Sequence, residues 1–369
     1  MALAALTVAL LGSGLRPAPA LAAGMRLTSF PAAGLPGSQL AVDLAGFPTA
    51  QSVTIAIDGN PLANVSVPAR TTTEAAVQLP AGLSAGTHAL EATDVNGLVL
   101  AQTPFTVTST ADAAVVERSF ASVALAATVR LAVYLPPGYA TSSLRYPVLY
   151  FLHGLPASPT AYRSWMPIIQ RAMSELGGSG AIVVIPQAAR AGDRDPEYHD
   201  WGRGRNWETE LAVELPRVVD ATYRTIPTRR GRALIGVSAG GYGAFALGLH
   251  HLDTFAALES WSGYFEPTDA SGRVQLDLGS AAANARATAF TIVPDLARVL
   301  ARMPTFIGFY VGLQDALFRS DNIRLHDYLA AEAVPHTFSL YPGGHHADLW
   351  SAQATAWIEM ALGQLSPAA

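Results

Sequence analysis

The chain contains no cysteine and no lysine among its 369 residues. Without cysteine it can form no disulfide, no iron–sulfur cluster, no thiolate nucleophile and no zinc site with cysteine ligands. Without lysine it lacks the P-loop lysine that contacts phosphates and the amine that Schiff-base chemistry needs. All 23 basic residues are therefore arginines, and the stability of the fold has to come from packing rather than from cross-links.

Charged residues are also scarce, at 14% of the chain, and the formal net charge is -5. Nucleic-acid binding normally needs a basic patch that neutralises phosphates, so we expect no nucleic-acid partner. No motif indicates a metal or an organic cofactor, and we expect neither. Hydrophobic residues make up 50% of the chain, which is enough for two globular domains with a sizeable core.

Residues 1–22 form an apolar run that ends in small residues, and Ala20-Leu21-Ala22 fits the small-x-small cleavage rule. We therefore predict a signal peptide over 1–22 and a secreted or cell-wall-associated protein. No arginine precedes the apolar run, so an upstream start codon or an uncleaved anchor is an alternative, and a buried N-terminal helix is another. No other segment has the ~20 uncharged apolar residues of a membrane span.

Residues 25–110 alternate apolar and polar positions with the period of half-buried strands, as in Val53, Ile55 and Ile57. Turn signals such as "DGNP" and "DVNG" recur at short spacing, which predicts a small immunoglobulin-like β-sandwich domain. This segment contains neither tryptophan nor tyrosine. Because sugar-binding modules stack sugar rings on exposed aromatics, a spacer or a contact to the cell wall is the expected role.

After a linker near 109–117, strands alternate with helices over residues 112–369, which predicts a mostly parallel sheet with helices on both faces. The expected strands lie in "YPVLYFLHG", "AIVVIPQ", "RALIGVS", "FAALESWSGYF", "TFIGFYVG" and "HTFSLYPGG". The expected helices include 207–223 with a kink at Pro216, 240–251, 324–334, and 348–365 with Trp350 and Trp357 on its apolar side.

The sequence "GVSAG" places Ser238 between a strand over 233–237 and a helix rich in small residues. This G-x-S-x-G pattern is weak evidence alone, but the strand-turn-helix context is that of a nucleophile elbow, which exposes a serine hydroxyl above a sheet. Gly236 and Gly240 suit a tight turn that leaves no room for side chains on either flank. Ser238 is therefore the candidate nucleophile.

A serine needs a histidine to take its proton and a carboxylate to orient that histidine, and in this fold the chain order is serine, acid, histidine. Asp315 follows the strand in "FYVGLQDAL" and is the preferred acid. Asp321 is the alternative, although its place ahead of a helix is explained by a capping or first-turn role.

The base should follow the last strand, where "YPGGHHADLW" supplies His345 and His346. We choose His345, because adjacent side chains point in different directions and only one can reach Ser238. The other histidines, among them His250 and His251 at a helix end, have ordinary structural explanations.

Two backbone N–H groups should stabilise the negative oxygen that forms during acyl transfer. One belongs to Ala239, directly after the serine. The other is expected from Leu155, because His153 and Gly154 end an early strand in "YFLHGLPAS".

Between the strand that ends at Pro186 and the helix that begins at Trp207 lies a segment with several aromatic residues. Loops at the carboxyl ends of parallel strands build the pocket in such folds, so Tyr198, Trp201 and Trp207 are candidate substrate contacts. The alternative is that these rings anchor the loop on the core. For Glu208 and Glu210, stabilisation by the helix dipole is a sufficient explanation.

The stretches "VYLPPGY", "YPVLYFLHG", "WETELAVELPRVVDATYRT", "GVSAGGYGAFALGLHHLDTFAALESWSGYF", "GLQDAL" and "YPGGHHADLW" together resemble an esterase family of α/β-hydrolases. This family includes esterase D-like enzymes, feruloyl and acetylxylan esterases and secreted mycolyltransferases. The resemblance covers about 250 residues and implies an α/β-hydrolase fold with Ser238 as nucleophile, Asp315 as acid and His345 as base. Ala239 stands where many members have methionine, and His346 where an acidic or polar residue is common.

The leading hypothesis is a secreted serine carboxylic-ester hydrolase that works through an acyl-enzyme on an acyl ester or an acylated carbohydrate. The second is an acyltransferase of the mycolyltransferase type, which moves the acyl group to a sugar hydroxyl. The third is a non-catalytic wall-binding protein. A complete set of Ser238, Asp315 and His345 argues against the third, because the three work only as a unit.

Overall fold

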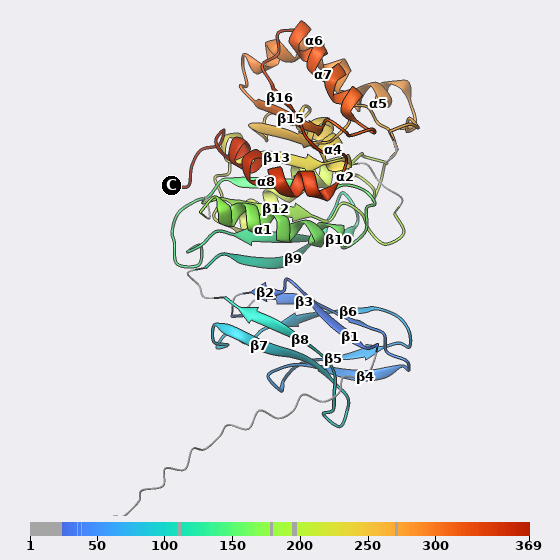
Figure 1. Ribbon diagram of the computed structural model, residues 1–369, viewed down its shortest axis with the longest axis vertical. Coiled ribbons are helices and arrows are strands. Elements are labelled where there is room, and N and C mark those ends of the chain that lie inside the picture. The colour runs from blue at the N-terminus through green and yellow to red at the C-terminus, as the bar shows by residue number, and fades with distance from the viewer. Residues whose placement is uncertain are drawn as a thin grey trace, which may run out of the picture. The chain divides into compact units, whose positions relative to one another are not determined.

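The structure is a computed structural model that describes residues 24–34, 36–37, 39–108, 112–177, 180–193, 198–269 and 272–369 (Figure 1). The predicted signal peptide over 1–22 lies outside these residues. Ala41–Val77 and Thr87–Phe105 belong to one compact unit, while Phe30–Leu40, Gln78–Gly86 and Thr106–Ala369 belong to the other. The domain boundary expected between 110 and 112 stays a prediction, since 109–111 are not described.

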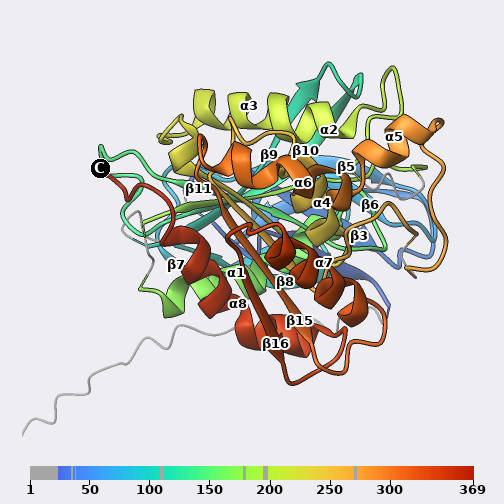
Figure 2. The same ribbon diagram turned by 90° about the horizontal axis from the view of Figure 1, so that it is seen from above.

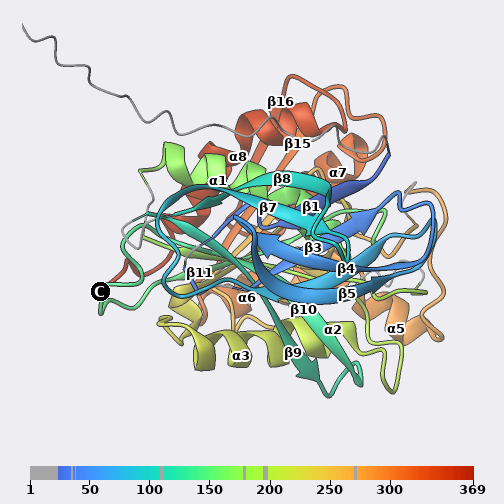
Figure 3. The same cartoon turned by 90° about the horizontal axis from the view of Figure 1, so that it is seen from below.

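The described residues between 26 and 107 are all-β and form two sheets (Figure 3). One sheet has the order β1-β3-β6, and the other has the order β2-β8-β7-β4-β5. The strands are β1 (Arg26–Phe30), β2 (Ala33–Gly34), β3 (Gln39–Ala45), β4 (Gln51–Ile57), β5 (Asn60–Val67), β6 (Thr73–Gln78), β7 (Gly86–Thr93) and β8 (Val99–Val107). The immunoglobulin-like assignment of this region stays a prediction.

The expected turn at "DGNP" joins β4 to β5 as a two-residue hairpin. Ile57 pairs with Asn60, and the two residues between them, Asp58 and Gly59, have φ angles of 48° and 75°. Such turns favour Asp-Gly because both positions need a positive φ. On β4, Val53, Ile55 and Ile57 are buried, as their spacing predicts.

The second unit contains an eight-stranded sheet of order β16-β15-β14-β13-β11-β12-β10-β9. Its strands are β9 (Ala114–Ser122), β10 (Ala127–Leu135), β11 (Val148–Leu152), β12 (Ile182–Pro186), β13 (Arg232–Val237), β14 (Ala257–Trp261), β15 (Phe306–Gly312) and β16 (Thr337–Tyr341). β9, β10 and β12 pair antiparallel in that order, and the pairings from β12 to β16 are parallel. All six predicted strand segments are confirmed.

Helices cover both faces of this sheet, as the sequence predicts (Figure 2). Residues of α1 and α8 pack in the buried cluster on one face, whereas residues of α3, α4, α6 and α7 pack in the cluster on the other. The α-helices are α1 (Met166–Glu175), α2 (Trp207–Thr209), α3 (Leu215–Thr222), α4 (Ala239–Gly248), α5 (Ala281–Arg286), α6 (Ala289–Leu300), α7 (Arg319–Ala331) and α8 (Ala347–Leu362). Short 3₁₀ helices span Ala161–Trp165 and Arg229–Gly231. Trp350 and Trp357 of α8 are buried, as expected.

The expected linker near 109–117 is wrong in its second half. β9 begins at Ala114, so Glu117 lies in a strand, where its buried carboxylate accepts a bond from Arg163 Nη2 at 2.9 Å. A charged residue interrupts the apolar pattern that identifies a buried strand. The sequence did not reveal this strand position, because Glu117 is buried only through a partner 46 residues away.

The expected helix over 207–223 is divided into three parts. Between α2 and α3, residues Glu210–Glu214 form a π-helical turn that ends just before Pro216. Proline has no N–H to donate and crowds the preceding turn, which explains why the helix is interrupted there. The kink expected at Pro216 stays a prediction. Helix α7 begins at Arg319 rather than at 324, because it follows directly on the turn around Asp315.

Within the described residues, no helix combines the length and the apolar composition that crossing a membrane requires.

Glu259 of β14 is a fully buried acid. The indole Nε1 of Trp261 and the hydroxyl of Tyr310 each donate to its carboxyl oxygens at 3.2 Å. Burial raises the pKa of Glu259 to about 8 despite these two bonds, because the ionised form would lose its hydration.

The raised pKa of Glu259 predicts that the free energy of unfolding decreases as the pH rises. Its pKa is higher in the folded than in the unfolded chain, so its contribution is complete below the unfolded pKa of about 4.3 and is lost as the pH rises through about 8. Glu259→Gln should flatten the pH dependence of the free energy of unfolding over this range, measured by urea denaturation. Exposed Glu332→Gln is the control; equal pH profiles for wild type and Glu259→Gln would contradict this expectation.

Candidate active site

Ser238 lies in a sharp turn between β13 and α4. Its backbone has φ 54° and ψ -121°, a strained conformation that a tight strand-to-helix turn imposes. A Cβ on Gly236 would lie 2.2 Å from the carbonyl oxygen of Gly240, and a Cβ on Gly240 would lie 2.0 Å from that of Leu152. The two glycines are therefore required by the close approach of three backbone segments.

The structure brings Ser238, His345 and Asp315 together. His345 Nε2 lies 3.0 Å from Ser238 Oγ, and His345 Nδ1 lies 2.8 Å from Asp315 Oδ2. The three residues follow β13, β15 and β16, and their strands run parallel, so their loops meet at one edge of the sheet. A proton can pass along this line from the serine to the imidazole.

Asp315 is buried, and its two carboxylate oxygens have different partners. Oδ1 accepts the backbone N–H groups of Leu317 and Phe318, each at 3.0 Å, and Oδ2 faces His345. A buried carboxyl group needs such hydrogen-bond donors in place of the water that it loses on folding. With Oδ1 held by the turn, Oδ2 is directed at the imidazole, which sets Nδ1 as the protonated nitrogen.

Asp321, the alternative acid, has other partners. It accepts the backbone N–H of Phe265 at 2.8 Å and pairs with Arg324 at 2.7 Å, in the first turn of α7. Burial raises the pKa of Asp321 even though Arg324 opposes the change. The structure therefore places Asp315, and not Asp321, against His345.

The ring of His345 lies between two aromatic side chains. Phe318 and Trp350 meet it edge to face, with ring centroids 5.1 and 4.9 Å away. The indole Nε1 of Trp350 donates to Ser262 Oγ at 3.0 Å, which ties α8 to the end of β14 beside Ser238. The side chain of His345 keeps 17% of its surface exposed, so it is held on its flanks and open toward the serine.

His346 begins α8 as its N-cap residue, with an extended backbone and no hydrogen bond from its side chain to the cap. Its carbonyl accepts the N–H of Leu349 at 3.1 Å. Of the two adjacent histidines, His345 is thus the one that contacts Ser238. The sequence analysis chose the same histidine.

The assignment of Ala239 and Leu155 as N–H donors stays a prediction, and the structure brings the chain segments of both close to Ser238. Ala239 is the first residue of α4, so its N–H has no acceptor within the helix. A Cβ on Gly154 would lie 3.1 Å from Ser238 Cβ, which places the chain just before Leu155 against the serine. His153 is buried and donates from Nδ1 to the carbonyl of Gly154 at 2.8 Å; burial lowers the pKa of His153, which favours the neutral ring.

The three predicted substrate contacts divide into two kinds. Tyr198 is 4% exposed and its hydroxyl donates to the carbonyl of His153, while Trp207 is 1% exposed and packs against Leu125. These two rings therefore fit the alternative, in which they anchor the loop on the core. Trp201 is half-buried and remains a candidate substrate contact.

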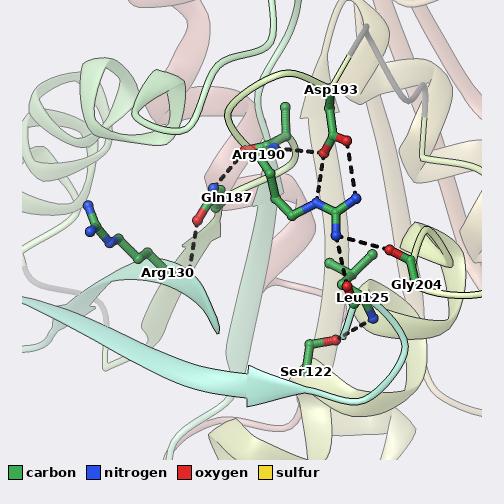
Figure 4. A network of polar contacts seen from close by, with 8 residues as sticks. Ser122, Leu125, Arg130, Gln187, Arg190, Asp193 and Gly204 are labelled. Atoms are coloured by element: carbon green, nitrogen blue, oxygen red, sulfur yellow. Dashed lines mark hydrogen bonds and ion pairs between the residues drawn. The ribbon is translucent and has the colours of Figure 1, made fainter. Parts of the chain in front are cut away.

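An arginine that the sequence analysis did not single out holds this loop in place (Figure 4). Arg190 donates from Nε and Nη2 to the two carboxylate oxygens of Asp193, at 3.0 and 3.1 Å. Its Nη1 donates to the carbonyls of Leu125 and Gly204 at 2.8 and 2.9 Å. One guanidinium thus joins both ends of the loop to the β9–β10 hairpin, which no local sequence pattern reveals.

Stabilisation by the helix dipole does not explain why Glu208 and Glu210 are buried. Glu208 accepts two bonds of 2.6 Å from Arg286 and one of 3.1 Å from His251; although burial opposes it, these bonds lower the pKa of Glu208 to about 2. Glu210 lies in the π-helical turn, and burial together with Glu214 raises its pKa. Glu208 thus joins α2 to α5, a role that depends on tertiary contacts.

Comparison with curated proteins finds enzymes of related sequence. The chain is 34% identical over 131 residues to an esterase of Mycobacterium tuberculosis, covering 36% of this chain and 28% of that protein. It is 33% identical over 135 residues to a diacylglycerol acyltransferase/mycolyltransferase of Mycobacterium leprae, covering 34% of this chain and 38% of that one. The matches thus span about a third of the length of these curated relatives.

Among solved structures, a ferulic acid esterase matches with a TM-score of 0.57 at 22% sequence identity, covering 69% of this chain and 100% of that one. This likeness shows the α/β-hydrolase fold. The family model described as "Putative esterase" matches residues 122–357, more than half of the chain. The glycine-flanked serine, the order of the sheet and this match lead to one conclusion: the chain belongs to that esterase family of α/β-hydrolases.

Proposed function

We propose that the protein is a serine carboxylic-ester hydrolase that acts through Ser238, His345 and Asp315 and forms an acyl-enzyme. The observation that carries the proposal is the continuous line of contacts from Ser238 Oγ to His345 to Asp315, at 3.0 and 2.8 Å. Membership of the esterase family supports the reaction class.

In the first half of the reaction, Ser238 Oγ attacks the carbonyl carbon of the ester while His345 Nε2 takes the hydroxyl proton. Asp315 stabilises the imidazolium that forms, through the bond to Nδ1–H. The carbonyl oxygen becomes negative and is stabilised by the N–H groups of Leu155 and Ala239, each worth about 10²- to 10³-fold in rate. His345 then protonates the departing alkoxide, the alcohol leaves, and the acyl group remains on Ser238.

In the second half, water replaces the alcohol. His345 Nε2 takes a proton from the water, the hydroxide attacks the acyl carbon, and the bond to Ser238 Oγ breaks. The proton returns to Ser238 and the carboxylic acid is released. The same groups therefore act in both halves of the reaction. Because the imidazole exchanges a proton with Ser238 in each half, its ring has to stay in one position, and its contacts with Phe318 and Trp350 hold it there.

An acyltransferase is the second candidate, and the match to a mycolyltransferase favours it. In that reaction a sugar hydroxyl, in place of water, attacks the acyl-enzyme. Both candidates need the same three residues. They differ in whether water or a sugar hydroxyl reaches the acyl-enzyme from the exposed side of the site. An acyl ester or an acylated carbohydrate is the proposed substrate, and half-buried Trp201 is a proposed contact for it.

A secreted or cell-wall-associated location completes the proposal, with the N-terminal β region as a spacer or wall contact. Its support is the apolar, small-residue composition of residues 1–22.

A fluorophosphonate probe should label the wild-type protein and leave Ser238→Ala unlabelled, because the probe reacts with an activated serine hydroxyl. In-gel fluorescence checks this. A Ser143→Ala variant, which alters an exposed serine in the chain before β11 and outside the contacts of the three residues, is the control and should still be labelled. Labelling of Ser238→Ala would remove the assignment of the nucleophile.

His345→Ala and His346→Ala should differ sharply in the hydrolysis of short-chain p-nitrophenyl esters. His345→Ala should lower kcat by about 10⁴- to 10⁶-fold, because losing one member of such a triad removes most of its effect. His346→Ala should stay within about threefold of wild type, because the His346 side chain makes no cap bond and lies outside the proton line. Equal losses in the two variants would mean that the base is misassigned.

Hydrolysis and transfer can be separated by analysing products with a sugar acceptor present. If the protein is a hydrolase, the free acid should account for nearly all of the acyl group at every acceptor concentration. A sugar ester that grows with acceptor concentration at the expense of the acid would establish the transferase instead. Ser238→Ala should form neither product, which is the control for uncatalysed exchange.

A further inference from the structure

A cavity of about 890 Å³ lies at the edge of the sheet opposite Ser238. Phe306 and Thr337, which line it, are the first residues of β15 and β16, whereas the triad residues follow the carboxyl ends of the strands. The cavity is therefore separate from the candidate active site. Its volume is within the roughly 300–1,000 Å³ of small-molecule pockets.

Much of the cavity wall is apolar. The apolar lining residues come from the position before β14, the start of β15, the end of α6 and the C-terminal segment after α8. They include Ala256, Leu300, Phe306, Ile307 and Leu365. A wall of this kind favours the aliphatic or aromatic part of a ligand, because binding removes apolar surface of both partners from water.

Two arginines, Arg229 and Arg230, line the same cavity, and its lining includes no aspartate or glutamate. Among the described residues, neither arginine forms an ion pair within 4.0 Å. In a chain with a formal net charge of -5, this is a local concentration of positive charge without a carboxylate in contact.

Arg229 is fixed by neutral acceptors. Its Nε donates to the carbonyl of Leu252 at 2.7 Å, and its Nη2 donates to the Thr305 hydroxyl at 2.7 Å and to the carbonyl of Pro304 at 3.1 Å. Burial and the nearby Arg230 lower the pKa of Arg229, with Asp253 acting in the opposite direction. The positive charge is thus held in position without full compensation, a state that a bound anion would relieve.

The one histidine in the lining is already engaged. The Nδ1 of His336 donates to the carbonyl of Val334 at 2.8 Å, and its Nε2 lies 2.8 Å from His326 Nδ1. The two arginines are therefore the groups in the lining that could bind an anion. Within the described part of the chain, the exposed side chain of Arg230 has no hydrogen bond that fixes it.

We propose that this cavity binds a monocarboxylate with an apolar body, with the carboxylate on Arg230 beside Arg229 and the body against Leu300, Ile307 and Leu365. A guanidinium and a carboxylate form paired, charge-assisted hydrogen bonds, which gives the site its preference for this head group. Carboxylic acids are ionised at neutral pH. The esterase activity proposed above would release such molecules, but binding here does not depend on that activity.

The test uses the full chain with Ser238→Ala, so that turnover is absent, and measures binding by isothermal titration calorimetry. Decanoate should bind saturably, and decanol and decyltrimethylammonium should bind at least about tenfold more weakly. A phenylpropanoate arm distinguishes an aliphatic from an aromatic body, and binding of either acid supports the site. Equal affinity for decanoate and decanol, or for decanoate and inorganic phosphate, would overturn it.

Two further variants and one matched control, all in the same background, locate the site. Arg230→Ala should weaken decanoate binding about tenfold, whereas the matched control Arg302→Ala, an exposed arginine outside the lining, should leave it unchanged. Ala301→Trp, at an exposed position of the rim, should obstruct the cavity and also weaken binding, with its thermal unfolding checked against Ser238→Ala. Equal effects of Arg230→Ala and Arg302→Ala would place the carboxylate elsewhere and refute the proposal.

Discussion

The turn at Ser238 is the constraint on which the rest of the site depends. Three backbone segments, from β11, β13 and α4, approach so closely there that Gly236 and Gly240 cannot carry a Cβ. This crowding forces Ser238 to a φ of 54° and lifts its side chain above the end of the sheet. The strain is offset by the buried strand β13 before the turn and the buried helix α4 after it, which hold the turn from both ends.

The parallel strands then determine what can meet this serine. Because β13, β15 and β16 run in the same direction, the loops after them share one edge of the sheet. The loop after β15 supplies a buried carboxylate held by its own backbone, and the loop after β16 supplies an imidazole held between Phe318 and Trp350. Each group is oriented by contacts that do not involve a substrate, so the line from Ser238 to Asp315 exists before any ligand binds.

The same topology separates the two ends of the sheet. The edge with Ser238 has a buried carboxylate and a histidine, whereas the opposite edge has two arginines and an apolar wall. A parallel sheet places all strand starts together as well as all strand ends, so both edges can gather residues from distant parts of the chain. This arrangement is why one chain can hold the candidate active site and a separate cationic cavity without shared residues.

The sequence alone determined the elements and the roles that local patterns encode. Continuous apolar runs identified the six strands, the glycines around Ser238 identified the turn, and chain order pointed to the loops that contain Asp315 and His345, because these features depend on neighbouring residues and on the order of strands. Which acid and which of the two adjacent histidines align with Ser238 is decided by tertiary contacts. Only the tertiary structure decided features that depend on distant partners: the burial of Glu117 by Arg163, the engagement of Glu208 by Arg286 and His251, and the anchoring of the loop by Arg190. It also decided that Trp207 is buried while Trp201 is half-exposed, since both tryptophans stand in similar sequence surroundings and what covers each ring comes from other parts of the fold.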